Sequence, residues 1–239
     1  MTNRSIPGGT AQPSREAASG AHGAILALET GGRACSVAIT VGSVILAQET
    51  VVTDHGQATL LMPMIERVRS AAGYDYAKLD RIAVAVGPGS FTGLRVGIAA
   101  ALGLSLATGV PAVGISSFHA TAAIRAEERA DLRRFVLLDS RRDEPFLAEL
   151  DAEQRFVRPP VVVSIERLDA ILASAGPAIL TGDAPILSRG GFPRDIRILP
   201  AQPNAIRVAA LAADPSRRYD LPPEPVYVRP PDVTLAKSS

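Results

Sequence analysis

The sequence predicts an α/β protein made of two related halves. Three observations support this prediction. Short apolar runs of strand length alternate with helical patterns, the order of these segments repeats once along the chain, and 47% of the 239 residues are hydrophobic. A hydrophobic share of this size can fill the core of one large domain or of two small ones.

Charge and cysteine content exclude several classes of function. The chain carries 25 basic and 24 acidic side chains, a net charge of +1, so it has no strong overall electrostatic attraction to nucleic acid. Its one cysteine, Cys35, excludes an internal disulfide and a multi-cysteine metal site. Because Cys35 lies in an apolar strand pattern, we expect a buried side chain.

The N-terminal segment has a composition unlike the rest of the chain. Residues 1–23 are rich in Gly, Ser, Pro and Ala and lack the apolar core of a secretory signal. We therefore expect a disordered tail and a cytoplasmic protein. No uncharged apolar run reaches the roughly 18 residues that would span a bilayer.

The first half of the chain predicts one α/β lobe over residues 24–116. Its apolar runs predict strands, its amphipathic patterns predict helices, and Gly42 suits a tight hairpin between two of the strands. Pro63 falls inside the first helical pattern, where it marks either a kink or the first turn. The expected strands are 24–28, 34–41, 43–52, 82–86 and 112–115, and the expected helices are 55–72, 92–108 and 117–129.

The second half repeats this order with shorter segments, which predicts a reduced second lobe over residues 117–214. Ser164 is the expected N-cap of its first long helix. Residues 215–239 form a proline-rich, extended tail in which only residues 226–228 have the composition to pack. The expected strands are 135–138, 145–150, 178–181 and 196–199, and the expected helices are 164–175, 184–189 and 204–213.

A glycine-rich loop at residues 87–93 follows a predicted strand and precedes a predicted helix. Glycines permit positive φ and close backbone approach, and the N-terminus of a helix presents N–H groups to an anion. Ser90 or Thr92 can cap this helix. The loop is therefore either a phosphate-binding loop or a plain tight turn, and it is not a Walker loop because no Gly-Lys-Ser/Thr follows.

The helix after this loop has almost no bulk on one face. Small residues recur every four positions, which permits close packing either on the protein's own sheet or on a partner: Gly93, Gly97, Ala101 and Ser105. Leu94, Ile98 and Leu102 form a second apolar stripe beside them. A helix that is apolar on two faces must bury both, so a protein partner is favoured.

Residues with catalytic chemistry are sparse. His22 lies in the tail, His55 begins a helix, and His119 has no Cys or carboxylate at metal-ligand spacing, so we expect neither a metal nor another cofactor. Ser116-Ser117 does not lie in a Gly-x-Ser-x-Gly elbow, which argues against a serine hydrolase. The charged turn at residues 139–144 is either a solvated loop or a functional one.

Several segments, taken in order, resemble the TsaB (YeaZ) family. The glycine-rich segment Gly-Pro-Gly-Ser-Phe-Thr-Gly-Leu-Arg is the most distinctive of them, and the match is more specific in the first half of the chain than in the second. The matching segments are residues 25–30, 34–38, 55 with 60–65, 87–97, 111–117, 138–141 and 225–229.

The resemblance implies an actin/hexokinase/Hsp70-like (ASKHA) fold and a role in tRNA modification. Members of the family work with a sister subunit, TsaD, and an ATPase, TsaE. Together these proteins form threonylcarbamoyladenosine next to the anticodon of tRNAs that read ANN codons, and TsaD performs the transfer. The family also implies pairing with TsaD, or homodimer formation, through the first two helices of the N-terminal lobe.

The chain departs from the pattern of the catalytic sister. Ser117 and Thr121 stand where TsaD has its two metal-binding histidines, and neither can replace an imidazole as a ligand at neutral pH. The nucleotide apparatus also looks degenerate, since Glu29 replaces the usual aspartate and Asp139 lacks flanking glycines. We therefore expect no catalytic residue and a degenerate nucleotide-type loop made of Glu29, Gly87, Gly89, Ser90, Thr92, Gly93 and Asp139.

These observations predict an accessory subunit whose partner interface lies on the two helices of the first lobe. The expected interface residues are Leu60, Leu61, Met64, Ile65, Val68, Leu94, Arg95, Gly97, Ile98 and Ala101. The alternative is an ATP-dependent small-molecule kinase of the same superfamily, which would need acids at Glu29 and Asp139. A glycopeptidase has no supporting constellation of residues, and the turn at Arg141-Arg142 offers too few arginines for a typical RNA patch.

Overall fold

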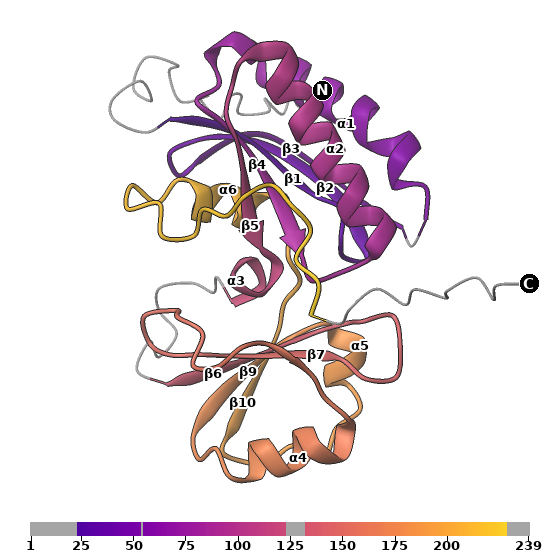
Figure 1. Ribbon diagram of the computed structural model, residues 1–239, viewed down its shortest axis with the longest axis vertical. Coiled ribbons are helices and arrows are strands. Elements are labelled where there is room, and N and C mark those ends of the chain that lie inside the picture. Colours follow the sequence, from indigo (N-terminus) through magenta and orange to yellow (C-terminus); the bar gives the residue numbers. More distant parts are fainter. Residues whose placement is uncertain (1–22, 54, 123–131, 229–239) are drawn as a thin grey trace, which may run out of the picture.

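A computed structural model of the chain describes residues 23–53, 55–122 and 132–228. Two lobes, each built on one five-stranded sheet, lie one above the other along the long axis (Figure 1). The short helix α3 (Ser117–Ala122) lies between them, in contact with strands of both sheets.

The first sheet has the strand order β3-β2-β1-β4-β5. Its first three strands pair antiparallel, whereas β1 with β4 and β4 with β5 pair in parallel. These strands are β1 (Ala24–Glu29), β2 (Ala34–Val41), β3 (Val44–Val52), β4 (Arg81–Gly87) and β5 (Ala112–Ser116).

The second sheet repeats the order and the strand directions of the first. It runs β8-β7-β6-β9-β10, with antiparallel pairs on one side of β6 and parallel pairs on the other. Its strands are β6 (Arg133–Leu138), β7 (Phe146–Leu150), β8 (Val161–Val162), β9 (Ala178–Gly182) and β10 (Ile196–Pro200). The repeat in the sequence is therefore a structural duplication, as expected, although the two-residue strand β8 was not predicted.

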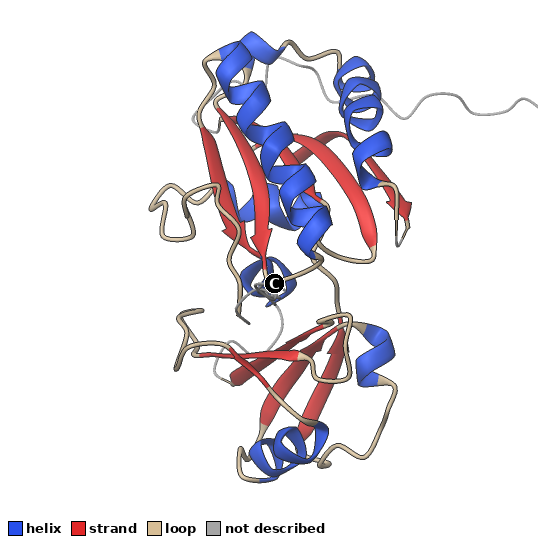
Figure 2. Ribbon diagram, turned by 45° about the vertical axis from the view of Figure 1, so that its right-hand side comes forward, coloured by secondary structure: helices blue, strands red, loops and turns tan. Residues whose placement is uncertain are grey.

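Helices cover both faces of the first sheet (Figures 1 and 2). Helices α1 (Gln57–Ala72) and α2 (Phe91–Thr108) pack on the face that carries Leu26 and Leu28. Helix α6 (Ala205–Ala212) packs on the opposite face, against alanines of β1, β2 and β4. Burial on both sides explains why β1 reads as a continuous apolar run rather than an alternating one.

The position of α6 corrects the lobe boundary expected from the sequence. Residues 117–214 were assigned to the second lobe, but α6 buries Ala205, Val208, Ala209 and Ala212 against the first sheet. The small side chains on both surfaces allow this helix to lie close to the sheet. Sequence periodicity predicts such a helix correctly but does not indicate which sheet it covers.

The second lobe is smaller than the first. Its core packs α4 (Ile165–Ala173) against β6, β7 and β9 through residues such as Leu168 and Leu172. Ser164 caps α4 by accepting a hydrogen bond from the amide of Arg167 at 3.3 Å, as expected. The remaining helices are α5 (Ala184–Leu187) and, in the first lobe, the single-turn η2 (Tyr76–Lys78).

The segment after α6 returns along the first lobe. Leu221 exchanges two backbone hydrogen bonds with Gly114 of β5, at 2.8 and 2.9 Å. The amide of Val226 then donates to the carbonyl of Val86 at 2.8 Å. Tyr227 stacks on Phe91 and Val228 packs on the cluster around Val136, as their composition predicted, whereas Val226 is 42% exposed. Tyr219, which was expected to lie in an unpacked tail, is buried.

Candidate functional site

The glycine loop predicted to bind phosphate is packed against the turn between β1 and β2. The amide of Ser90 donates to the carbonyl of Gly31 at 2.8 Å, and the hydroxyl of Thr30 donates to the carbonyl of Gly93 at 2.7 Å. A Cβ on Gly89 would lie 2.6 Å from the oxygen of Gly31. Here the glycines make room for the protein's own backbone, which supports the interpretation of a tight turn.

Helix α2 begins directly after this loop. Ser90 is its N-cap and accepts a hydrogen bond from the amide of Gly93 at 3.3 Å, whereas Thr92 lies exposed in the first turn. A Cβ on Gly93 would lie only 2.1 Å from the carbonyl oxygen of Thr30. Gly87 has a φ of 110°, in the region that favours glycine. The loop therefore fixes the direction in which α2 leaves the sheet.

Glu29 lies fully buried at the end of β1, beneath the same turn. Its Oε1 accepts the amides of Gly31 and Gly32 at 2.7 and 2.9 Å, while Oε2 has no partner. Burial raises the pKa of Glu29 from 4.5 to about 8, although the two amide bonds act in the opposite direction. At neutral pH this side chain is a neutral acid, which makes it a poor ligand for Mg²⁺ and a poor general base.

Asp139 joins the two lobes at the end of β6. Its carboxylate pairs closely with Arg33 of the first lobe and accepts the amide of Arg141 at 2.8 Å. The amide of Asp139 in turn donates to Asp183 at 2.8 Å, and burial raises the pKa of Asp183. Asp139 is therefore a link in a chain of ion pairs and hydrogen bonds across the inter-lobe boundary.

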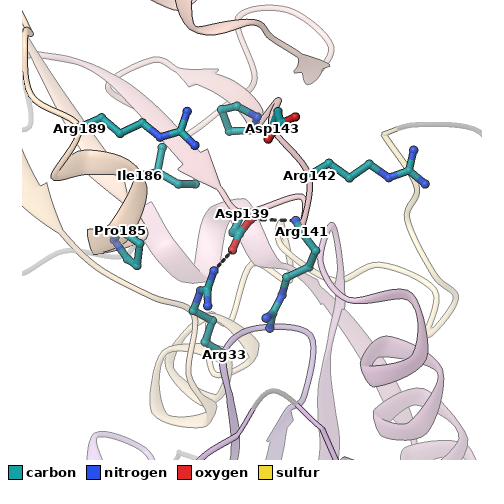
Figure 3. Close-up of a pocket in the computed structure, with 9 residues that line it drawn as sticks. Arg33, Asp139, Arg141, Arg142, Asp143, Pro185, Ile186 and Arg189 are labelled. Carbon is teal, nitrogen blue, oxygen red and sulfur yellow. Dashed lines mark hydrogen bonds and ion pairs between the residues drawn. The ribbon is translucent and has the colours of Figure 1, made fainter.

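A pocket of about 370 Å³ opens beside this link. Figure 3 shows Arg33 and Arg141 meeting at Asp139, with Arg142 and Arg189 extending from the two sides. Arg33 belongs to the first lobe and Arg189 follows α5 in the second lobe, so arginines from both lobes line the pocket. This composition favours an anionic ligand.

A second pocket, of about 510 Å³, lies on the other side of Arg33 and Arg141. It is formed where α1 and α2 begin, and we call it the helix-end pocket. Its lining residues are Arg33, His55, Gly56, Gln57, Ser90, Thr92 and Arg141.

Most residues predicted for the partner interface lie in the protein's own core, which corrects that prediction. Side chains buried to 95% or more cannot contact a partner without unfolding the lobe. These are Leu61, Met64, Ile65, Val68, Leu94, Ile98 and Ala101, and Gly97 is buried with them.

The two remaining predicted interface residues have other neighbours. Leu60 is half-buried against the same core. Arg95 is exposed, but its guanidinium lies 3.7 Å from the ring centroid of Phe91, and its Nε donates to the hydroxyl of Tyr227 at 3.3 Å. Arg95 therefore holds the returning C-terminal segment on α2.

The outer face of α2 carries an apolar stripe of which the sequence analysis singled out only Leu102, and it grouped Leu102 with Leu94 and Ile98, which are buried. Ala99, Leu102, Gly103 and Leu106 recur at helical spacing and all are exposed, Leu102 by 45% and Leu106 by 90%. We call these four residues the outer stripe. Within the described residues α2 is also long and apolar enough to cross a membrane, but its inner face packs on the protein's own sheet.

The two positions at which the resemblance implies metal ligands in the sister enzyme lie in the interior of this chain. Ser117 and Thr121 are both buried, and the hydroxyl of Thr121 donates to the carbonyl of Ser117 at 2.8 Å within α3. The described residues contain no cluster of three His, Cys, Asp or Glu side chains that could hold a metal. His22 lies outside the described residues.

His119 is half-buried and Cys35 is fully buried, and both pack within the protein. The ring of His119 packs against Phe156 and Tyr219, and its Nε2 lies 2.8 Å from the carbonyl of Gln154. Burial lowers the pKa of His119, so the ring is neutral at pH 7. Cys35 is fully buried in its strand, as expected, and burial raises the pKa of its thiol to about 11.

Three polar residues of these pockets were missed by the sequence analysis: Arg33, Gln57 and Arg189. Each stands alone in an ordinary local pattern, and only the tertiary fold brings it to the inter-lobe boundary or to the start of α1. The glycine loop at 87–93, where the sequence suggested phosphate binding, does not point to these residues. Its glycines face the backbone of residues 30 and 31 instead.

Comparison with known proteins shows the relationships of the chain. A family model described as TsaD, tRNA N6-adenosine threonylcarbamoyltransferase, matches residues 49–180, which is more than half of the chain. The tRNA threonylcarbamoyladenosine biosynthesis protein TsaB of Escherichia coli is 32% identical over 131 residues, covering 54% of this chain and 56% of that protein. The chain thus matches little more than half the length of this relative.

Solved structures agree with these matches. A Pseudomonas aeruginosa protein described as similar to peptidase YeaZ superposes with a TM-score of 0.72 at 25% identity, covering 87% of this chain and 100% of the other. YeaZ from the same organism superposes with a TM-score of 0.70 at 24% identity, covering 86% and 99%. The chain has the two-lobed α/β fold of these proteins. It belongs to the family that the TsaD model describes and, within it, to the TsaB (YeaZ) proteins.

Proposed function

We propose that the chain is a non-catalytic subunit that pairs with a TsaD threonylcarbamoyltransferase and activates it. The reaction would form threonylcarbamoyladenosine next to the anticodon of tRNAs that read ANN codons. TsaE and the tRNA would join through the complex, and a homodimer would use the same surface as TsaD. The similarity of the chain to proteins named TsaB and TsaD supports this role.

The outer stripe of α2 is the observation that carries the proposal. Leu106 is 90% exposed although leucine gains about 1.5 to 3 kcal/mol from burial. Gly103 has open space where a Cβ would be, so another backbone can approach α2 closely at that point. Met62 of the neighbouring helix α1 is exposed as well, by 48%.

The state of the inter-lobe residues supports a non-catalytic role. Glu29 is held neutral by burial, and Asp139 is engaged by Arg33 and by the amide of Arg141. Buried hydroxyl side chains occupy the two positions of the sister enzyme's metal ligands. Asp139 and Arg33 thus serve to join the two lobes, and Glu29 serves to hold the turn after β1.

Leu106→Glu and Gly103→Arg test the interface. Both positions are exposed and neither side chain packs in the core, so each variant should keep the wild-type melting temperature. A charge in the centre of an interface costs several kcal/mol, so the Kd for TsaD should rise by a hundredfold or more, about 3 kcal/mol. Size-exclusion chromatography and calorimetry with the sister subunit measure the loss, and a tRNA threonylcarbamoylation assay measures its consequence.

Val157→Glu is the matched control, because Val157 is also exposed (52%) but lies in the second lobe. It should pair and activate normally. Gly97 is unsuitable as a test position because its Cβ would lie 2.3 Å from the hydroxyl of Thr30, so a large side chain would unfold the lobe. Normal pairing by both outer-stripe variants would refute the interface.

The arginine-lined pocket between the lobes favours one alternative, an ATP-dependent small-molecule kinase. Calorimetric titration of the isolated chain with Mg-ATP separates the two functions. Turnover of ATP by the chain without its sister subunit would establish the kinase.

A further inference from the structure

We propose that the helix-end pocket is a binding site for a phosphate group. This site lies apart from the outer stripe, and it does not depend on the glycine loop acting as a phosphate loop. Two helix N-termini, a buried side-chain amide and two arginines converge on it. The chemistry of the ligand follows from these donors.

Both helices direct the positive ends of their dipoles at the pocket. Helix α1 begins at Gln57 after its cap residue Gly56, whose φ is 83° and which has no side chain to accept a bond from the first amides. Helix α2 begins beside Thr92, and its cap Ser90 accepts only the amide of Gly93. The helices are 16 and 18 residues long, so each carries a full macrodipole.

Gln57 supplies a second and independent indication of a ligand. Its side chain is only 6% exposed, it lines the pocket, and its Nε2 has no hydrogen-bond partner. An amide donor shielded from water without an acceptor is destabilising, and such groups in native proteins need an explanation. A ligand oxygen that reaches this wall of the pocket, with a small rotation of the amide, supplies the missing acceptor.

The charge of the pocket selects an anion. Arg33 and Arg141 are two of its lining residues, and among the residues that the structure describes none that lines it is acidic. Arg33 also pairs with Asp139, and Arg141 donates to the carbonyl of Gly32 at 2.9 Å. A guanidinium has five N–H donors in a planar fork, so these contacts are compatible with binding a phosphate as well.

A phosphate ester fits the pocket better than a bare ion. Donors surround it from two helix ends, one side-chain amide and two guanidinium groups, which suits the several oxygens of a tetrahedral group. The volume of about 510 Å³ also leaves room for the group that the phosphate is attached to. Two sources share this chemistry, a nucleotide phosphate and a phosphodiester of an RNA backbone.

Calorimetry on the full chain tests the proposal with three probes: inorganic phosphate, AMP, and a short RNA without terminal phosphates. We expect saturable binding at low salt of at least one probe. Binding of phosphate and AMP identifies a monoester site, whereas binding of the RNA alone identifies a diester site. No saturable binding of any probe at millimolar concentration would overturn the proposal.

Three variants locate the site. Gln57→Leu keeps the buried volume and removes the orphaned amide, so it should melt at or above the wild-type temperature while its Kd rises about tenfold. Arg141→Gln should weaken binding at least as much, whereas Arg142→Gln, which alters only the neighbouring inter-lobe pocket, should not. Wild-type affinity in Gln57→Leu, or an equal loss in Arg142→Gln, would place the ligand elsewhere. None of these variants alters the outer stripe, so co-elution with TsaD should be unchanged.

Discussion

The buried carboxyl of Glu29 predicts a specific dependence of stability on pH. Its pKa is about 8 in the folded protein and 4.5 when exposed in the unfolded chain. Between these values the folded state holds a proton that the unfolded state has lost. Stability is therefore fully present below about pH 4.5, and it falls as the pH rises toward 8 by about 1.4 kcal/mol per pH unit.

Glu29→Gln removes this dependence with little change in structure. Both backbone amides donate to the same oxygen, Oε1, and the glutamine carbonyl can accept both of them. The side-chain NH2 then stands where the protonated Oε2 stood. Between pH 5.5 and 7.5 the free energy of unfolding of the wild type should fall, relative to the variant, by about 3 kcal/mol.

Urea unfolding followed by circular dichroism at several pH values measures this difference, since the chain has no tryptophan for fluorescence. Glu66→Gln is the control, because Glu66 is exposed and Arg69 lowers its pKa. It should leave the slope in this window unchanged. If Glu29→Gln showed the same slope as the wild type, Glu29 would be ionised in the folded state and the argument from burial would be refuted.

Three further predictions concern stability. Gly93→Ala should destabilise the chain by several kcal/mol in urea unfolding, because its Cβ would meet the carbonyl oxygen of Thr30 at 2.1 Å. Gly103→Ala, on the open face of the same helix, should instead stabilise it by up to about 1 kcal/mol; a loss of stability there would contradict the assigned orientation of α2. Arg81→Ala breaks a largely buried ion pair with Asp220 and should lower the free energy of unfolding by about 3 kcal/mol. Proteolysis of the C-terminal segment should also become faster. Proteolysis at the wild-type rate would show that this pair does not anchor the segment.

Sequence periodicity predicted most of the strands and helices because each is buried on a regular face. It also predicted the duplication, since the same order of segments recurs. It missed β8, because two residues are too few for any pattern. It assigned α6 to the wrong lobe, because a helix of small residues fits either sheet equally well by composition.

The partner surface shows a different limit. Helix α2 is apolar on both sides, with Leu94 and Ile98 on one and Leu102 and Leu106 on the other. Both sides have helical spacing and both contain a glycine, so the sequence alone cannot assign either to the core. The structure shows which side is buried, because Gly97 lies against Thr30 whereas Gly103 faces open space.

The pockets between and beside the lobes were the least predictable features. What draws attention to Gln57 is that its side-chain amide has no hydrogen-bond partner. This property depends on the residues around it in the folded chain and not on its neighbours in sequence. Arg33 and Asp139 are 106 positions apart and belong to different lobes. Ion pairs of this kind follow only from the way in which the lobes are joined.

The path of the chain through α6 makes the first lobe discontinuous in sequence. Its sheet is complete at Ser116, but the alanine-rich face of that sheet stays uncovered until Ala212 has been synthesised. On the ribosome, the second lobe therefore emerges and can fold before the first lobe has its full core. The second lobe is in effect an insertion within the first, so a chain cut after α5 would leave an exposed apolar sheet face that invites aggregation.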